Sequence, residues 1–167
     1  MSGALIVTAG LGSADFSQFD QLRRTHFPPE RNQLSAHLTM FHALPPSAEV
    51  EIVALLKALA VAHPPAATTD GLINLGKGVA IRIWSAELAA HRAHIASHFH
   101  GSLTSQDAAG WRPHITIQNK MESKEAKALF DGLAKQWHDR PVQIAALELH
   151  RYMGGPWAPI GRYSFRG

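Results

Sequence analysis

Hydrophobic and polar positions follow two periods along the chain, one typical of strands and one typical of helices. Short apolar runs bounded by glycine or proline predict a hairpin over 71–84 and strands over 3–11, 34–43, 112–118, 141–152 and 161–166. Apolar residues that recur every three or four positions predict helices over 15–26, 48–62, 86–100 and 124–138. The N-caps expected for the last three helices are Ser47, Ser85 and Ser123. The segments between these elements, including 62–71, are read as loops, and the mixture predicts an α+β fold.

One short pattern occurs twice in the chain. AHLTMF at 36–41 and PHITIQ at 113–118 each hold a histidine, an aliphatic residue, a threonine and another apolar residue. The two histidines lie 77 residues apart (114 − 37), and each motif strand is expected to follow one helix and precede another. This period is longer than that of solenoid repeats, so it favours a two-lobed fold with pseudo-twofold symmetry. No linker divides the chain, and we therefore expect one bilobal domain over 1–167.

The spacing within each motif determines which side chains share a face of the strand. Because side chains alternate along a strand, His37, Thr39 and Phe41 are expected on one face and His42 on the other. Each strand then presents an imidazole and a hydroxyl side by side, in front of an apolar face. The corresponding side chains of the second copy are His114, Thr116 and Gln118.

Two imidazoles that converge across a cleft suit in-line displacement at phosphorus. The neutral imidazole takes a proton from the attacking oxygen, and the protonated one gives a proton to the leaving oxygen. The hydroxyls of Thr39 and Thr116 can donate hydrogen bonds to the non-bridging oxygens as charge develops there. Pseudo-symmetry leaves the roles exchangeable, and we take His114 as the base and His37 as the acid. This arrangement needs no metal and no other cofactor.

The paired H-x-T motifs, the RPHITI context at 112–117 and the order of elements resemble the 2H (two-histidine) phosphoesterase superfamily. Within it, the chain is most similar to the 2′-5′ RNA ligase-like and cyclic phosphodiesterase group, over nearly its whole length. The resemblance implies a duplicated fold in which antiparallel sheets line a central cleft and helices lie outside. It also implies a hydrolase that acts without metal on 2′,3′-cyclic phosphates or 2′-5′ linkages, at RNA ends or on small nucleotides.

Several further residues are candidates for contact with such a substrate. Relatives often carry an arginine shortly after the second motif, whereas here Gln118 is followed by Asn119 and then by the base Lys120. Lys120 and Arg82 are candidate phosphate contacts, with solvated surface charges as the alternative. Tyr152 and Trp157 are candidates for stacking on a base, with a core or turn role as the alternative.

Composition excludes some kinds of metal site and leaves two rival hypotheses for the function. There are no cysteines, so disulfides and cysteine-based zinc sites are excluded. Among eleven histidines, His91, His94 and His98 share one predicted helix, and a metal-dependent hydrolase built on them is one rival hypothesis. A second rival is a non-catalytic module that binds an RNA end or nucleotide in the same cleft.

Charge and hydropathy indicate the environment and the partner. The net charge of +3 favours an anionic partner, which we expect to be an RNA terminus or a small cyclic nucleotide. The sequence contains no apolar run of membrane-spanning length and no signal-peptide pattern at its start. We therefore expect a cytoplasmic monomer with no membrane contact and no protein partner.

Overall fold

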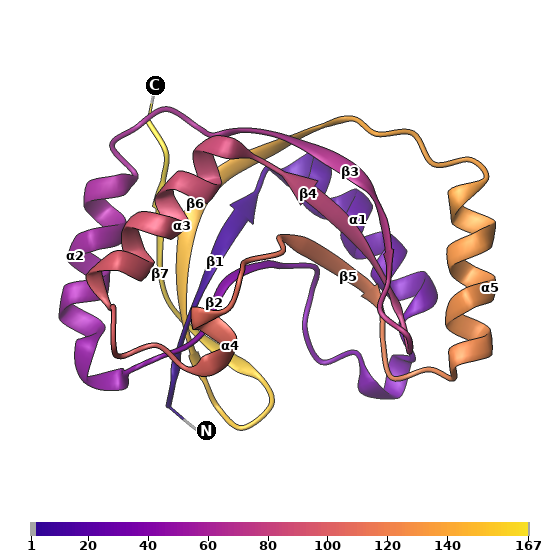
Figure 1. Ribbon diagram of the computed structural model, residues 1–167, viewed down its shortest axis with the longest axis horizontal. Helices are drawn as coiled ribbons and strands as arrows, with labels where there is room; N and C mark the ends of the chain where they lie inside the picture. Colours follow the sequence, from indigo (N-terminus) through magenta and orange to yellow (C-terminus); the bar gives the residue numbers. More distant parts are fainter. Residues whose placement is uncertain (1–2, 167) are drawn as a thin grey trace.

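A computed structural model describes residues 3–166 and contains, within them, seven strands and five α-helices (Figure 1). The strands are β1 (Leu5–Leu11), β2 (Leu38–Leu44), β3 (Ala66–Asn74), β4 (Val79–Trp84), β5 (His114–Gln118), β6 (Pro141–Tyr152) and β7 (Trp157–Ser164). The helices are α1 (Ser13–His26), α2 (Glu49–Leu59), α3 (Ala86–His98), α4 (Ser105–Ala108) and α5 (Ser123–Ala134). Two short 3₁₀ helices, η1 (Pro29–Arg31) and η2 (Pro46–Ala48), precede β2 and α2.

All strands pair antiparallel in one sheet with the order β2-β1-β6-β3-β4-β5, and β7 pairs with β6. The long strand β6 joins the two halves of this sheet. Its first residues, Pro141 to Gln143, pair with β3, and the rest of the strand pairs with β1 and β7. The predicted α+β class with antiparallel strands is confirmed.

The two motif strands, β2 and β5, stand at opposite ends of the strand order, yet they lie close together in space. The sheet curls to bring its ends together, and both strands run through the middle of the molecule (Figure 1). Helices α2 and α3 lie outside one half, and α1 and α5 lie outside the other. Helix α1 packs against β5 although it follows β1 in the chain. Helix α1 therefore ties the two halves together, as does β6.

Buried apolar residues pack each half of the sheet against its helices. Strand β1 is buried along its whole length, and the side chains of Ile52 and Leu56 on α2 are fully buried in the same core. In the other half, Ile81, Ile83 and Ile115 are buried while the residues between them are more exposed. Burial of each such side chain contributes about 1.5–3 kcal/mol to the free energy of folding, so this core stabilises the positions of the motif strands.

Strand β3 begins earlier than the sequence predicts. The segment 62–71 is expected to be a loop, but Ala66 to Thr68 pair with β6. Asp139 reinforces this region, because its Oδ1 accepts hydrogen bonds from the Thr69 hydroxyl and the Gly71 amide. The prolines and glycine around the segment concealed a strand that is stabilised by a partner distant in sequence.

The predicted helix caps are right in one case of three. The Ser85 hydroxyl accepts a hydrogen bond of 3.1 Å from the Leu88 amide at the start of α3. Ser47 lies instead inside η2, and Ser123 is the first helical residue of α5, so neither prediction is correct. Within residues 3–166, none of the helices combines the length and the apolar character that a bilayer crossing requires.

Candidate active site

His37 and His114 are anchored in the same way in the two halves. The His37 Nδ1 lies 2.8 Å from the carbonyl oxygen of Ser35, and the His114 Nδ1 lies 2.7 Å from that of Arg112. A carbonyl oxygen only accepts hydrogen bonds, so each Nδ1 carries the proton and donates it. The Nε2 atom of each ring is therefore left for a ligand or a proton in transfer.

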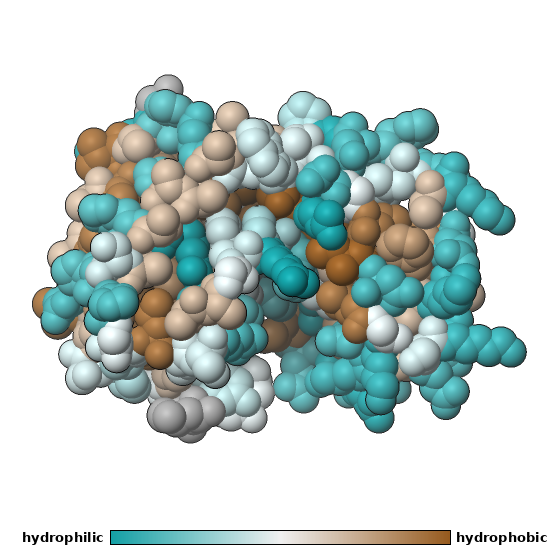
Figure 2. All heavy atoms as spheres, in the orientation of Figure 1, coloured by the Kyte–Doolittle hydropathy of each residue, from teal (hydrophilic) through white to brown (hydrophobic). Residues whose placement is uncertain are grey.

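The four motif side chains line one cavity of about 410 Å³, to which both halves contribute. His37 and Thr39 come from the start of β2, and His114 and Thr116 come from β5. The space-filling view shows a hollow between the two halves, bordered by both hydrophilic and hydrophobic side chains (Figure 2). The structure thus brings the predicted histidines and threonines together in one cleft.

Each motif strand contains a β-bulge directly after its threonine. Between Thr39 and Phe41, β2 has one residue more than the facing stretch of β1. Between Thr116 and Gln118, β5 likewise has one residue more than the facing stretch of β4. Bulges of this kind redirect side chains and are common beside active sites. The extra residues are Met40 and Ile117, at equivalent positions of the two copies.

The bulges overturn the predicted alternation beyond the threonines. Phe41 and Gln118 are expected to face the cleft with the motif residues, but both are buried and neither lines the cavity. His42 is expected on the opposite face of β2, but it lines the same cavity as His37. One inserted residue reverses the faces of everything that follows it, so strict alternation fails here.

The redirected His42 is held by a buried carboxylate. Its Nδ1 lies 3.2 Å from Oδ1 of Asp107, which is fully buried. Asp107 also accepts hydrogen bonds of 2.9 Å from the backbone amides of His42 and Ala43. Burial raises the pKa of the Asp107 carboxyl, but these hydrogen bonds outweigh burial and the net shift is downward. Asp107 is therefore an anion that fixes His42 at the cleft.

Side chains of the outer helices satisfy carbonyl groups beside the bulges. The buried Arg23 of α1 donates a 3.0 Å hydrogen bond to the Thr116 carbonyl, and the buried Arg92 of α3 donates one of 3.2 Å to that of Met40. The Trp111 indole donates a 3.0 Å hydrogen bond to the Thr39 carbonyl. Sequence reasoning missed these roles, although Arg23 lies among the apolar residues of its helix.

Trp157 covers one side of His37. The centroids of the two rings are 4.7 Å apart in an edge-to-face arrangement, and Trp157 also lies 5.3 Å from the His150 ring. Burial lowers the pKa of His37 to about 4, and the nearby charge of Arg23 acts in the same direction. His37 is therefore neutral at pH 7.

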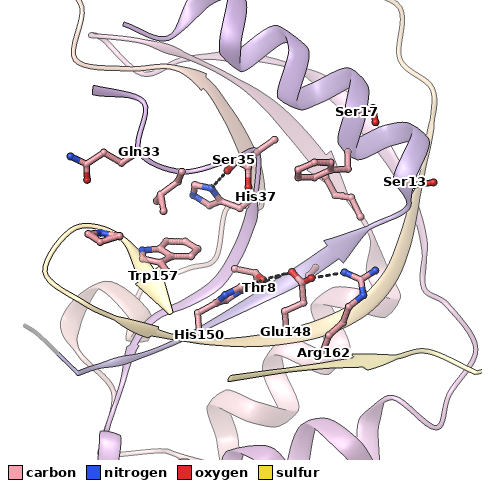
Figure 3. Close-up of a pocket in the computed structure, with 16 residues that line it drawn as sticks. Thr8, Ser13, Ser17, Gln33, Ser35, His37, Glu148, His150, Trp157 and Arg162 are labelled. Carbon is pink, nitrogen blue, oxygen red and sulfur yellow. Dashed lines mark hydrogen bonds and ion pairs between the residues drawn. The ribbon is translucent and has the colours of Figure 1, made fainter. Parts of the chain in front are cut away.

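A second cavity of about 650 Å³ adjoins the cleft and shares His37 and Trp157 with it (Figure 3). On its floor the Thr8 hydroxyl donates to Glu148 Oε1 at 2.9 Å and lies 2.9 Å from His150 Nε2. A hydroxyl has one proton, so His150 must be the donor in that second contact. His150, which the sequence analysis does not single out, thus belongs to a chain of hydrogen bonds with Thr8 and Glu148.

An ion pair extends this chain across β1. Arg162 donates to the other oxygen of Glu148, and the pair passes directly over Gly10. A Cβ at position 10 would lie 2.8 Å from the Arg162 guanidinium and 3.0 Å from the Glu148 carboxyl carbon. A side chain at position 10 would therefore displace the Arg162 guanidinium from its place over the strand.

The other predicted contact residues lie around the cleft at different places. Lys120 and Tyr152 line a cavity of about 330 Å³ together with His37 and Thr116. Lys120 has a φ of 62°, in the left-handed region that favours glycine. Arg82 does not line the cleft of the motif residues and lies instead in a neighbouring cavity of about 440 Å³.

Two of the three helix histidines proposed as metal ligands contact separate neighbours. The ring of His91 stacks on Phe165 at 5.5 Å, and His98 Nε2 lies 3.0 Å from a carboxylate oxygen of Glu51. No cluster of three or more potential ligands that suits a metal ion occurs within residues 3–166. The structure gives no support to a centre built on these histidines.

A sequence model of the 2′-5′ RNA ligase superfamily matches residues 12–156, and the chain belongs to this family. Solved structures with the same fold include TT0787 of Thermus thermophilus, with a TM-score of 0.64, 16% identity and 98% of each chain covered. They also include E. coli LigT complexed with 3′-AMP, with a TM-score of 0.60, 15% identity and 100% of each chain covered. A structure described as a phosphoesterase has a TM-score of 0.58 and 18% identity over 99% of each chain. No curated protein sequence matches the chain significantly.

Proposed function

We propose that this protein is a metal-independent phosphoesterase that acts on a 2′,3′-cyclic phosphate or a 2′-5′ phosphodiester, at an RNA end or on a small nucleotide. The observation that carries the proposal is the matched anchoring of two imidazoles in one cavity. Each ring holds its Nδ1 proton on a carbonyl oxygen and keeps Nε2 for the substrate. All four motif residues come from one chain, so the site needs no second subunit.

The surroundings of the histidines favour one assignment of acid and base. His37 is neutral at pH 7, because burial lowers its pKa to about 4, so it serves as the base. His114 then donates the proton to the leaving oxygen. This is the reverse of the assignment favoured from the sequence, which had no means of seeing that Trp157 covers His37.

The threonine hydroxyls stabilise the charge that develops on the phosphorus. Thr39 and Thr116 lie on the same strands as the histidines and line the same cavity. They donate hydrogen bonds to the non-bridging oxygens when the five-coordinate state forms. The substrate phosphate is held between two imidazoles and two hydroxyls, and protein groups alone supply acid, base and charge stabilisation.

Known complexes of the similar proteins are consistent with a nucleotide in the cleft. E. coli LigT has been solved with 3′-AMP and with phosphate. In this chain, the cavity behind Trp157 has a volume of about 650 Å³, within the range of roughly 300–1,000 Å³ usual for small-molecule sites. It is lined by an indole ring and by polar groups whose charges are paired, which suits the neutral nucleoside attached to the phosphate.

The test is hydrolysis of 2′,3′-cyclic nucleotides by the purified protein in excess EDTA, followed by chromatography. We expect conversion to a nucleotide monophosphate, at a rate that His114→Ala lowers by roughly 10²–10⁴ and that the chelator leaves unchanged. Binding of the cyclic nucleotide without turnover would support the alternative, a non-catalytic RNA-end or nucleotide-binding module. Loss of turnover in EDTA that a divalent metal restores would show a metal-dependent hydrolase instead.

A further inference from the structure

The sheet face that carries His114 continues onto β4. Arg82 lies directly opposite His114 in the β4–β5 pairing, and residues opposite each other project from the same face. Trp84 is two residues further along β4 and therefore projects from that face as well. Ile81 and Ile83 are buried on the other face, which confirms the alternation on this strand. A line of side chains thus runs from the catalytic histidine through Arg82 to Trp84.

This surface is exposed and adjoins the catalytic cleft. Trp84 is 58% exposed, which makes it one of the few large apolar side chains on the surface of the described chain. Arg82 and Trp84 line a cavity of about 440 Å³ whose other wall includes Trp111 and Arg112. Trp111 and Arg112 also line the catalytic cleft, so the two cavities share these two residues in their walls.

The surface carries an excess of unpaired positive charge. Within residues 3–166, neither the Arg82 nor the Arg112 guanidinium has a carboxylate within 4.0 Å. Asp70 is the one acidic side chain that lines this cavity. An exposed indole flanked by free guanidinium groups suits a ligand that has a flat apolar face and a negative backbone.

We propose that Trp84, Arg82 and Arg112 form a binding platform for single-stranded RNA, on which the nucleotide next to the reacting one is held. The inference rests on the phosphoesterase function proposed above. The base stacks on the Trp84 indole, and the arginines contact the phosphate that connects it to the reacting nucleotide. Stacking is tolerant of base identity, so the platform selects for chain length and not for sequence. The substrate is then an RNA end, and a cyclic mononucleotide fills only part of the site.

The first experiment compares an RNA hexamer that ends in a 2′,3′-cyclic phosphate with the corresponding cyclic mononucleotide. We expect a higher kcat/KM for the hexamer in the wild type. Trp84→Ala should raise KM for the hexamer by about 5- to 100-fold, the usual range for one stacked base, and leave the mononucleotide within two-fold. Trp84→Phe should keep most of the hexamer preference. Equal kcat/KM for the two substrates, or equal effects of Trp84→Ala on both, would overturn the platform.

The second experiment measures binding and does not depend on turnover. Anisotropy of a labelled hexamer with a 3′-phosphate gives Kd at several salt concentrations. Arg82→Ala should weaken binding and reduce the slope of log Kd against log salt by about 0.7 for one lost phosphate contact. Arg24→Ala, which removes an exposed arginine paired with Asp20 on α1, is the matched control and should change neither quantity.

The two experiments together separate this inference from the proposed function. If the wild type hydrolyses neither substrate but binds the hexamer through Trp84, the platform stands and the phosphoesterase function falls. If it hydrolyses both substrates and the Trp84→Ala variant binds the hexamer as tightly as wild type, the platform falls. The second result would leave Trp84 as a contact for a protein, since tryptophan and arginine also dominate protein interfaces.

Discussion

The two motif strands share their backbone design and differ in what covers their histidines. Both histidines donate Nδ1–H to the carbonyl oxygen two residues earlier, and both strands bulge directly after the threonine. His37, however, packs against Trp157, whereas no aromatic ring within residues 3–166 stacks on His114. A duplicated motif therefore gives two imidazoles with the same geometry in different surroundings.

Under the proposed function, this difference accounts for an asymmetric reaction at a near-symmetric site. An acid and a base are needed at the same pH, and two identical imidazoles in identical surroundings would share both roles. Burial of one ring removes it from the titration range of an ordinary histidine and leaves it neutral. The ring that packs on His37 is Trp157 of the β6–β7 hairpin, and we infer that this hairpin, and not the motifs themselves, contributes the asymmetry.

The largest expected effect comes from removing either histidine. His37→Ala and His114→Ala should each lower kcat by roughly 10²–10⁴, the usual cost of losing a general acid or base. Because the two act as a unit, the double variant should lose far less than the product of the single losses. The measurement is steady-state hydrolysis of a 2′,3′-cyclic nucleotide over a range of pH.

The pH profiles of these variants also test the comparison between the two halves. His37→Ala should remove the acidic limb, and His114→Ala should remove the alkaline limb. His63→Ala, at an exposed histidine that contacts Glu87 on α3, is a control that should keep both limbs and the wild-type rate. If each variant lost the other limb, His114 would be the base, as the sequence alone suggested.

Removing a threonine hydroxyl should have a smaller effect. Thr39→Ala and Thr116→Ala should each lower kcat by roughly 10- to 100-fold, below the ~10²–10³ of a fully buried oxyanion donor. Both side chains are only half-buried, so water can replace part of the lost hydrogen bond. Thr→Ser at either position should retain most activity, because the hydroxyl is kept. A loss larger than that of the histidine variants would contradict a supporting role.

The repeat itself and the elements around it are visible in the sequence, since apolar periodicity and the H-x-T spacing are local signals. The four motif residues meet in one cleft because the fold is duplicated, which the repeat already indicates. The bulges at Met40 and Ile117 leave no such trace. Carbonyl groups beside both bulges accept hydrogen bonds from side chains distant in the sequence, Arg92 at Met40 and Arg23 at Thr116.

Residues far apart in the chain account for the rest of what sequence reasoning missed. Asp107 lies in a segment read as a loop, yet it is fully buried against β2, where it binds His42. His150 gains its role only when β6 pairs with β1 and places it beside Thr8. Arg82, a predicted contact of the substrate phosphate, lies outside the cleft of the motif residues and lines a neighbouring cavity. The positions of these residues depend on how segments distant in the sequence pair and pack, and this cannot be inferred from any one segment alone.

Replacement of His42 tests the bulge in β2 directly. His42 lines the cleft and is held by Asp107, and we expect its ring to add one hydrogen bond to the substrate phosphate beside those of the four motif residues. His42→Ala should remove this hydrogen bond. We expect KM to rise by roughly 10-fold, the scale of a hydrogen bond to a charged group, with kcat changed much less. His42→Gln should recover part of the loss. An unchanged KM would show that His42 does not contact the substrate.

The smallest expected change is a shift of the acidic limb in Trp157→Ala, and it isolates the cause of the asymmetry. A base is inactive below its own pKa, so a His37 pKa of about 4 places the acidic limb of kcat/KM near that pH, well below the ~6.5 of an ordinary histidine. Removal of the indole admits water to the ring, favours its charged form and raises its pKa toward 6.5. Activity at pH 5 should therefore fall relative to activity at pH 7.5.

Two control variants test whether the indole is the cause. Trp157→Phe should keep the acidic limb near its wild-type position. Trp137→Ala, at a tryptophan that donates a hydrogen bond to Asp139 away from the cleft, should not move the acidic limb. A wild-type limb already near 6.5 would show that Trp157 does not set the difference between the two histidines.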